Sequence, residues 1–166
     1  MRKLLLVMMA VMAFGMTACT RVQVSSLDQP LAVDLICIEQ NPKVIVDDFL
    51  KVLEDGIARN GMRSIVFTGN TPEGCEYIMT YTALRTWDIT PYLSHAEIWI
   101  HKSNRQVASA VYHLAGGGGL SLMKWQGTKT KMDPVIDELF SKSRGVRDPS
   151  VDEEPREKEK PDDAKL

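Results

Sequence analysis

The sequence has no excess of either charge and few cysteines. Its 166 residues include 20 lysines and arginines against 22 aspartates and glutamates, a formal net charge of −2. Domains that bind nucleic acid carry a clear basic excess, so this balance argues against a nucleic acid as partner. Three cysteines are too few for a disulfide scaffold. With 44% hydrophobic and 25% charged residues, a fully disordered chain and a multi-span membrane protein are also excluded.

Long apolar runs are also missing, apart from one near the N-terminus. Two basic residues at positions 2 and 3 precede the apolar run Leu4–Phe14, and the small residues Thr17 and Ala18 then lead to Cys19. The run is too short to span a hydrocarbon core of about 30 Å as a permanent helix. This order predicts a secretory signal over residues 1–18, with a helix of a protein core as the alternative.

The four residues Met16–Cys19 resemble the bacterial lipobox, whose cysteine is linked to diacylglycerol and becomes the mature N-terminus. That motif usually has leucine where this chain has Met16. The resemblance implies that Cys19 is a lipidation site that carries acyl chains such as palmitate and anchors the chain to a membrane. Thr20 stands where proteins kept in the inner membrane commonly have aspartate, which favours the outer membrane, facing the periplasm. Cleavage at an ordinary secretory site is the alternative.

The C-terminal segment, residues 144–166, consists almost entirely of charged residues and proline. It buries too little apolar surface to offset about 1–2 kcal/mol per residue of backbone ordering entropy, so we predict disorder. It is either a solvated terminus or a tail that binds a partner. A tether over residues 19–31 and this tail flank a single folded domain, residues 32–143.

The first half of the domain predicts a strand, a helix and a strand. Ala32–Gln40 is rich in valine, leucine and isoleucine, as is typical of a buried strand. Apolar residues at helical spacing from Val46 to Ile57 predict a helix that ends at Gly61. Met62–Thr68 is the second strand, and this order favours parallel pairing.

Three longer strands and a second helix follow. The strands are expected over Glu76–Asp88, His95–Lys102 and Arg105–Ala115, with Pro91 separating the first two. Asp133 and the proline after it supply an N-cap and a first-turn proline for the last helix. The order β-α-β-β-β-β-α implies an α+β fold, a two-layer mixed β-sheet with two helices on one face.

A two-residue turn at Ser103-Asn104 sets the register of one hairpin. It places on one face, the natural core side, Ala96, Ile98, Ile100, Val107 and Val111. The opposite face carries His95, Glu97, Trp99, His101, Ala108, Ala110 and Tyr112. The polar and aromatic members of this second face, His95, Glu97, Trp99, His101 and Tyr112, form the predicted binding face.

The histidines do not predict a metal site. His95 and His101 are six residues apart on one strand, so about 20 Å separates their Cα atoms. In the register above, His113 lies on the other face. We therefore expect no metal and no cofactor. Because no Gly-x-Ser-x-Gly elbow is present either, we expect a protein that is not an enzyme.

Cys37 and Cys75 are the cysteines that remain after lipidation. One lies in the first strand and the other just before the third, so they can meet if these strands are neighbours. Thiol pairs in the periplasm are usually oxidised, which favours a structural disulfide. Separate buried cysteines and a catalytic thiol are the alternatives.

The glycine run Gly116–Gly119 does not fit a phosphate-binding loop, because the spacing to the following Gly-Lys-Ser/Thr fails. The run indicates a sharp bend or bulge, or else a loop that changes shape on binding. Leu120–Trp125 is expected as a short extra strand. The tryptophans and tyrosines of the strand-rich half either form a partner surface or are covered and fill space.

Three segments carry a resemblance to one family. They are Thr82–Asp88 (Thr-Ala-Leu-Arg-Thr-Trp-Asp), Tyr112-His113 with the glycines after it, and Lys124–Lys131 leading to Asp133-Pro134. Over most of residues 19–140 the chain is similar to the Sbal-type lipoproteins, small proteobacterial proteins without an assigned activity. The resemblance therefore implies no catalytic residues. At fold level the element order is also similar to periplasmic lipoproteins of envelope assembly and lipid transport systems.

These features predict a membrane-anchored periplasmic domain that binds an envelope protein or lipid, without catalysis, through the predicted face or the glycine loop. The alternative is an envelope hydrolase or small-ligand-binding enzyme that uses His95, Glu97 or His113. A pocket that brings two of these side chains within about 3 Å of each other or of a serine favours the enzyme. A flat sheet face disfavours it.

Overall fold

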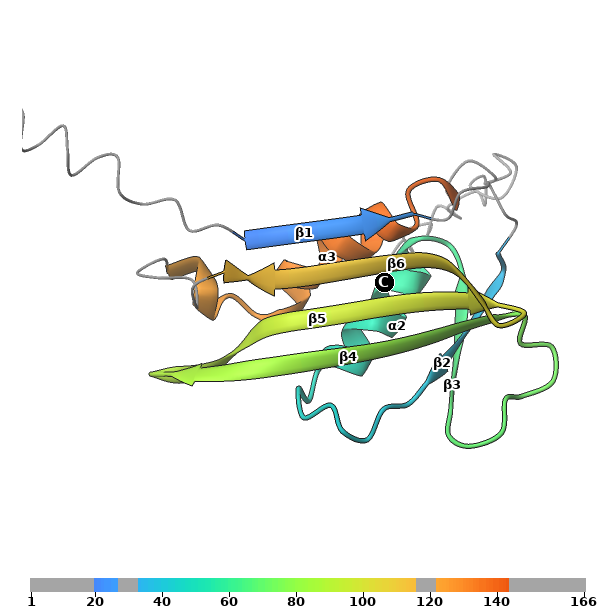
Figure 1. Ribbon diagram of the computed structural model, residues 1–166, viewed down its shortest axis with the longest axis horizontal. Helices are drawn as coiled ribbons and strands as arrows, with labels where there is room; N and C mark the ends of the chain where they lie inside the picture. Colours follow the sequence, from blue (N-terminus) through green and yellow to red (C-terminus); the bar gives the residue numbers. More distant parts are fainter. Residues whose placement is uncertain (1–19, 27–32, 116–121, 144–166) are drawn as a thin grey trace, which may run out of the picture.

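The computed structural model of the chain describes residues 20–26, 33–115 and 122–143. The predicted signal, Cys19, the glycine run and the charged tail lie outside these residues. A six-stranded mixed sheet forms one layer, and two α-helices form a second layer behind it (Figure 1). The predicted α+β class, with a mixed sheet and both helices on one face, is confirmed.

The described residues form six strands, two α-helices and one 3-10 helix. Their bounds are β1 (Thr20–Ser25), β2 (Leu35–Glu39), α2 (Phe49–Arg59), β3 (Arg63–Phe67), β4 (Tyr77–Asp88), β5 (Thr90–Lys102), β6 (Arg105–Leu114), the 3-10 helix η2 (Leu122–Trp125) and α3 (Thr128–Leu139). The strands lie in the order β1-β6-β5-β4-β2-β3. β2 is parallel to β3 and β4, and the other neighbouring pairs are antiparallel.

The β2–α2–β3 unit has the structure that the sequence predicts. α2 buries one stripe of its surface, made of Phe49, Val52, Leu53, Gly56 and Ile57. The helix is capped by Asn60, and Gly61 has a φ of 81°, a left-handed value that glycine adopts without a steric penalty. The predicted helix end at Gly61 and the parallel pairing of β2 with β3 are both confirmed.

The segment before the domain is not wholly a tether. Thr20–Ser25 is strand β1, at the edge of the sheet next to β6. Val22 pairs with Tyr112 and Val24 with Ala110, and both partners are buried. The valines therefore lie on the core side of the sheet, while the polar residues between them lie on the other side. Two valines in six residues are by themselves a weak indication of a strand. The segment forms a strand because it pairs with β6.

A β-bulge changes the register of the β5–β6 hairpin. The turn at 103–104 forms as predicted, with φ values of 48° and 63°. Shortly after it the register shifts by one residue, so that Ile100 pairs with Ala108 instead of Val107. One extra residue moves every later side chain of β6 to the other face, and the predicted faces of β6 are wrong for this reason. The core side of β6 consists of Ala108, Ala110, Tyr112 and Leu114.

The last helix begins earlier than the sequence predicts. α3 begins at Thr128 rather than at Asp133, and Pro134 lies inside it. The buried stripe of the helix consists of Thr128, Lys131, Met132, Val135, Ile136 and Leu139. The hydroxyl of Thr128 also donates a hydrogen bond to the carboxylate of Asp48 (2.7 Å). The first two residues of the stripe are polar, so apolar periodicity alone places the start of the helix too late.

Two shorter predictions are also wrong. Pro91 does not separate two strands but lies inside β5, opposite Trp87. β6 pairs with β5 only from His95 onward, so the N–H that proline lacks is not needed by β6. Leu122–Trp125 is a 3-10 helix and not part of an extra strand, while residues 120 and 121 lie outside the described ranges.

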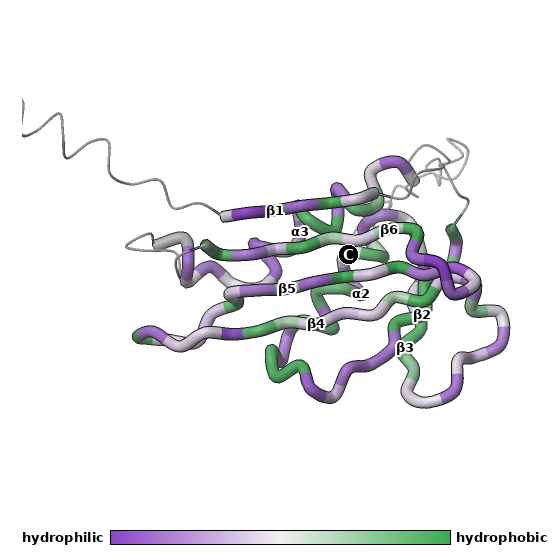
Figure 2. Tube along the Cα trace, viewed as in Figure 1, coloured by the Kyte–Doolittle hydropathy of each residue, from purple (hydrophilic) through white to green (hydrophobic). Residues whose placement is uncertain are grey.

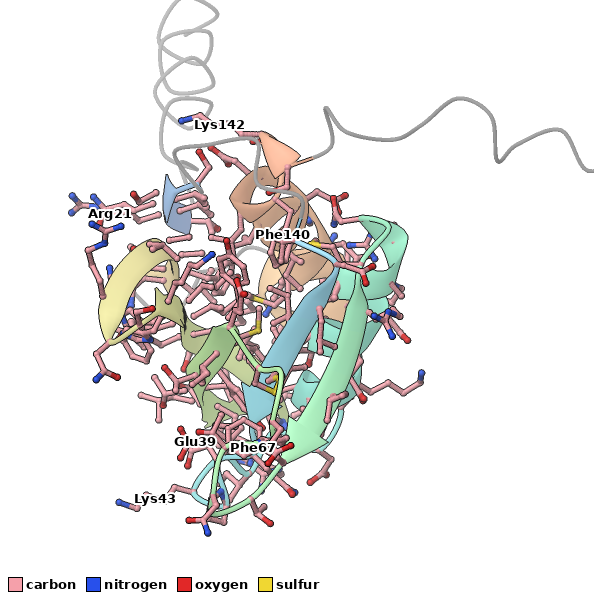
Figure 3. The ribbon with its side chains drawn as sticks, turned by 90° about the vertical axis from the view of Figure 1, so that its right-hand side faces the viewer. Arg21, Glu39, Lys43, Phe67, Phe140 and Lys142 are labelled. Atoms are coloured by element: carbon pink, nitrogen blue, oxygen red, sulfur yellow. A yellow bond between two sulfur atoms is a disulfide. The ribbon has the colours of Figure 1, made fainter. Side chains whose placement is uncertain are left out.

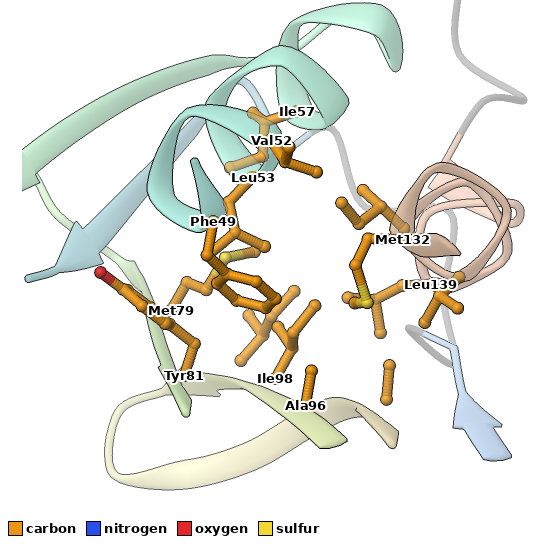
Figure 4. Close-up of a cluster of buried hydrophobic side chains, with 14 of the residues drawn as sticks. Phe49, Val52, Leu53, Ile57, Met79, Tyr81, Ala96, Ile98, Met132 and Leu139 are labelled. Carbon is orange, nitrogen blue, oxygen red and sulfur yellow. The ribbon is translucent and has the colours of Figure 1, made fainter. Parts of the chain in front are cut away.

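The hydrophobic core lies between the sheet and the two helices. Figure 4 shows Phe49 and Leu53 of α2 and Met132 of α3 converging on Ile98 of β5. The largest side chains that are almost fully buried are Phe49, Phe140, Ile36, Ile38, Leu53, Ile57, Met79, Ile98, Ile100, Met132 and Ile136. All of this core lies on one side of the sheet, so the other side remains available for a different role.

Candidate functional site

The helices cover one face of the sheet, and we call the other face of β1, β6, β5 and β4 the open face. Figure 3, viewed along the strands, shows Arg21 pointing away from the helices, whereas Phe140 lies in the interior. Cross-strand pairing sorts the side chains of the open face into rows. Three rows cross the strands in the order β1, β6, β5, β4. The first row is Arg21, His113, His95 and Leu84, the second is Gln23, Val111, Glu97 and Thr82, and the third is Ser25, Ser109, Trp99 and Thr80.

Three side chains in the first two rows form a hydrogen-bonded chain. Nε2 of His95 lies 2.8 Å from Oε1 of Glu97, and Nδ1 of His95 lies 3.2 Å from Nδ1 of His113. The imidazole rings of His95 and His113 meet edge to face, with 5.4 Å between their centroids. The side chains of His95 and Glu97 are 24% and 30% exposed, so solvent reaches this part of the open face.

The hydrogen-bond roles of these nitrogen atoms depend on the tautomers of the two imidazoles. A carboxylate only accepts hydrogen bonds, so Nε2 of a neutral His95 donates to Glu97. Nδ1 of His95 then accepts a hydrogen bond from Nδ1 of His113. Both nitrogens of His95 are engaged in this way. In this arrangement Nε2 of a neutral His113 carries a lone pair.

The structure places most, but not all, of the predicted binding face on one surface. His95, Glu97, Trp99 and His101 lie on the open face. Tyr112 does not: it is 4% exposed in the core, where burial raises the pKa of its hydroxyl.

His113 lies on the open face beside His95, whereas the register expected from the turn at 103–104 places it on the opposite face. The β-bulge after the turn causes this difference. The hairpin contains no glycine, the residue that most clearly indicates a bulge, so the sequence alone does not predict the bulge.

A cleft of about 330 Å³ opens beside Trp99 on the open face. Its lining combines the segment after β2 with β4 and β5, and consists of Glu39, Gln40, Asn41, Pro42, Thr80, Tyr81, Thr82 and Trp99. The side-chain amide of Asn41 donates to the main-chain oxygen of Tyr81 (2.9 Å), which fixes this segment against the sheet. Burial raises the pKa of the Tyr81 hydroxyl. The lining suits a polar or aromatic side chain of a partner.

A second cleft of about 330 Å³ lies on the helix side, between α3 and the β1–β6 pair. Lys131 lines it and is only 6% exposed. Its ammonium donates hydrogen bonds to the main-chain oxygens of Leu93 (2.9 Å) and Lys124, and so connects α3 to β5 and to η2. Burial lowers the pKa of Lys131. Its contacts give this lysine a structural role.

Cys37 and Cys75 form a disulfide. Their Cα atoms are 5.8 Å apart, and the bond ties β2 to the segment just before β4. β2 and β4 are parallel neighbours, so the condition for pairing these two cysteines is met. In this state neither sulfur is a thiol nucleophile, so the structure does not have the catalytic thiol that was one alternative at these positions.

Neither a metal site nor a membrane-crossing helix is found in the ranges 20–26, 33–115 and 122–143. No group of three His, Cys, Asp or Glu side chains in these ranges is arranged to hold a metal ion. No helix in them is both long and apolar enough to cross a membrane.

Comparisons with known proteins relate the chain to one fold and to no family. No family model matches the chain, and no curated protein matches it. Among solved structures it is similar to a dodecamer of a PelC variant from Paraburkholderia phytofirmans, with a TM-score of 0.52 and 10% identity over 78% of this chain and 100% of that chain. A second PelC dodecamer structure gives a TM-score of 0.48 and 10% identity over 74% and 97%. At this identity, the first likeness shows a shared fold only.

Proposed function

We propose that the protein is a lipoprotein of the bacterial envelope, of the Sbal type, whose folded domain binds an envelope protein without catalysis. The lipobox-like residues Met16–Cys19 support an anchor at Cys19, and Thr20 after it supports the outer membrane, facing the periplasm. The disulfide between Cys37 and Cys75 is in keeping with this compartment, because disulfides persist in oxidising surroundings.

The open face is the observation that carries the binding proposal. No described helix covers it, and yet it presents half-buried Trp99 and His95 together with Leu84, which is 55% exposed. Aromatic side chains offer a large contact area and a polar edge, and they are enriched at protein interfaces. The cleft beside Trp99 adds a recess into which a partner side chain can insert.

An envelope hydrolase or small-ligand-binding enzyme is the second candidate. The hydrogen-bonded chain of His113, His95 and Glu97 favours it, because the neighbouring groups approach within about 3 Å. However, neither cleft described above is lined by these three residues. The side chains of His113, His95 and Glu97 lie on a solvent-accessible surface of the sheet, whereas active sites usually exclude water from the reacting atoms. We therefore prefer a binding function.

Photo-crosslinking in intact cells tests the proposal. A photoreactive phenylalanine analogue is placed at Gln23, Thr82 or Ser109 on the open face. Matched controls carry it at Lys51 or Lys129, two exposed positions of the helix layer. We expect one distinct adduct with another envelope protein, from the open-face positions only. Equal adducts from both layers, or none from the open face, would contradict the proposal.

Self-association is the outcome that the same experiment separates from partner binding. PelC forms a dodecamer in the solved structures. Adducts that contain only a second copy of this chain would overturn a different envelope protein as partner. Mass spectrometry of each adduct distinguishes the two results, because it identifies both crosslinked peptides.

A further inference from the structure

The β4–β5 hairpin reaches beyond the rest of the sheet. Pairing of β5 with β6 ends at His95 and His113, whereas β4 and β5 pair for four more positions, as far as Asp88 with Thr90. Four residues of extended chain measure about 13 Å. We call residues 85–91 the hairpin tip. Figure 1 shows it as the projecting end of the sheet, at the left of the view.

Two large apolar side chains of the hairpin tip are exposed to solvent. Trp87 is 73% exposed and Ile89 is 77% exposed, more than any other large hydrophobic residue in the described chain. Figure 2 shows hydrophobic colour at this projecting end. Turns between strands ordinarily carry polar residues, so two neighbouring exposed apolar side chains at such a place indicate a contact surface.

The backbone of Ile89 is also unfavourable for its residue type. Its φ is 44°, in the left-handed region, where a β-branched residue is an outlier. Glycine or asparagine is the usual choice at such a turn position. Ile89 is therefore strained as well as exposed in the isolated domain. Strained residues cluster at sites of function, which strengthens the case for a contact at the hairpin tip.

The hairpin tip lies at the same end of the sheet as the start of β1. Thr20 pairs with Leu114, and the residue before it on β6, His113, pairs with His95 at the base of the hairpin. In Figure 1 the start of β1 and the hairpin tip accordingly both lie at the left end of their strands. Cys19 directly precedes Thr20 in the sequence, so a lipid on Cys19 is attached one residue before the start of β1. A membrane that holds a lipid on Cys19 therefore faces the end from which the tip projects.

We propose that the hairpin tip is a second membrane contact, in which Trp87 and Ile89 enter the headgroup region of the leaflet that holds the lipid of Cys19. This rests on the lipid anchor proposed above. Tryptophan favours the interfacial zone of a bilayer, and isoleucine adds apolar area to the contact. Arg85 and Arg21, both exposed at this end, face anionic headgroups. The contact holds the strands upright on the membrane and keeps the open face accessible from the side.

An ion pair offsets the negative charge of the hairpin tip and helps to order it. Nζ of Lys124, whose side chain is 8% exposed, lies 2.5 Å from the carboxylate of Asp88. Asp88 is the one acidic residue of the tip, and this pairing offsets its charge near an anionic surface. At the base, the hydroxyl of Ser94 donates to the main-chain oxygen of Leu84 (3.2 Å). A loop that is already ordered loses little entropy on binding.

Fluorescence of single-tryptophan variants tests the contact. The full chain is reconstituted into phosphatidylethanolamine–phosphatidylglycerol vesicles whose brominated acyl chains quench tryptophan. One variant keeps Trp87 alone, and the matched control keeps Trp99, which lies on the open face away from the tip. We expect a blue shift and loss of emission for Trp87 and neither for Trp99. Equal quenching of both tryptophans would overturn the proposal.

Ile89→Asn separates membrane contact from folding. Asparagine tolerates the left-handed backbone and removes exposed apolar surface, so we expect the urea midpoint to rise while the quenching of Trp87 falls. Ile65→Asn is the control, at a 43% exposed isoleucine on the far edge strand, and it is expected to leave the quenching unchanged. A fall in quenching that is equal in both variants would contradict a specific role for Ile89.

Two further measurements distinguish the tip contact from the anchor. Mass spectrometry of the N-terminal peptide reports the lipid on Cys19. A lipidated chain with unquenched Trp87 overturns the tip contact alone, whereas an unlipidated chain with quenched Trp87 overturns the anchor and supports the tip. If the tryptophan variants do not fold, photoactivatable phospholipids decide on the unmodified chain. Labels are expected within residues 85–91, and labels confined to other segments would overturn the proposal.

Discussion

Lys131 connects α3 to two other elements through a buried ammonium group. The hydrogen-bond acceptors are the main-chain oxygens of Leu93 and Lys124, and the ammonium also lies 5.3 Å from the centroid of the Tyr92 ring. Carbonyl oxygens compensate a buried positive charge less well than a carboxylate does. Burial accordingly lowers the pKa of Lys131 below its ordinary value of 10.5. The unfolded chain therefore binds this proton more tightly than the folded chain.

We predict that the Lys131→Met variant differs from the natural chain in the pH dependence of its stability. The charged lysine lowers the free energy of unfolding at neutral pH, and this penalty fades as pH rises through the lowered pKa toward 10.5. The natural chain should therefore gain stability relative to Lys131→Met as the pH is raised from neutral toward 10.5, measured by urea unfolding. Lys129→Met, at an exposed lysine paired with Asp133, is the control and should show no comparable gain. Parallel pH profiles for Lys131→Met and the natural chain would contradict the assignment.

At the scale of elements, the sequence predicts a strand or helix wherever the pattern is long. The strand that ends at Asp88 and the helix that ends before Gly61 are recognised because β-branched, aromatic or periodic apolar residues run through their length. β1 is missed because its two valines become a pattern only beside their partners on β6. The start of α3 is missed because Thr128 and Lys131 are buried through hydrogen bonds rather than through apolar character.

The candidate site depends on a feature that local patterns do not contain. The turn at 103–104 fixes the register only as far as the first bulge, and the bulge brings His113 to the open face beside His95. Ala108 and Ala110 are small on one face while Val111 is larger on the other, so hydrophobicity favours the wrong face of β6. Core packing decides the matter, because the core takes Tyr112 and Leu114 together with the alanines.

The contact between the two helices leads to a prediction about Gly56. A Cβ atom on Gly56 of α2 would lie 2.7 Å from Cγ2 of Ile136 in α3, and Ile136 is fully buried. Overpacking of this kind costs about 1–3 kcal/mol. Over most of this range the cost is larger than the gain of about 1 kcal/mol that alanine brings inside a helix. Gly56→Ala is therefore expected to lower the urea midpoint.

Ala58→Gly provides the matched control for this contact. Ala58 lies on the exposed side of α2, so glycine there loses helix propensity, about 1 kcal/mol, without changing a contact with α3. Alanine is thus the better residue at position 58 and the worse residue at position 56. A Gly56→Ala variant that is more stable than the natural chain would show that the helices separate easily at this point.

The whole molecule combines a rigid two-layer domain with two features at one end. The disulfide links β2 to the segment just before β4, and the hairpin tip and the start of β1 lie at the same end of the sheet. If Cys19 carries a lipid, the strands run from the membrane into the periplasm, and the rows of the open face lie at increasing height above it. The row of His95 and His113 is then nearest to the membrane, and the row of Trp99 is farther out. A partner on the open face would approach along the membrane plane.

The lipid anchor gives a prediction for the location of the entire molecule. Residues 1–18 are exchanged for a secretory signal with its own cleavage site, and Cys19→Ala removes the attachment point. We expect this protein in the soluble periplasmic fraction. Several acyl chains contribute about 0.8 kcal/mol per buried methylene, far more than Trp87 and Ile89 together. The hairpin tip alone therefore does not retain the domain. The control exchanges the same residues for the signal of an established lipoprotein and keeps Cys19; it should stay in the membrane fraction and take up labelled palmitate. Membrane retention of the Cys19→Ala protein, or a control free of palmitate, would contradict the anchor.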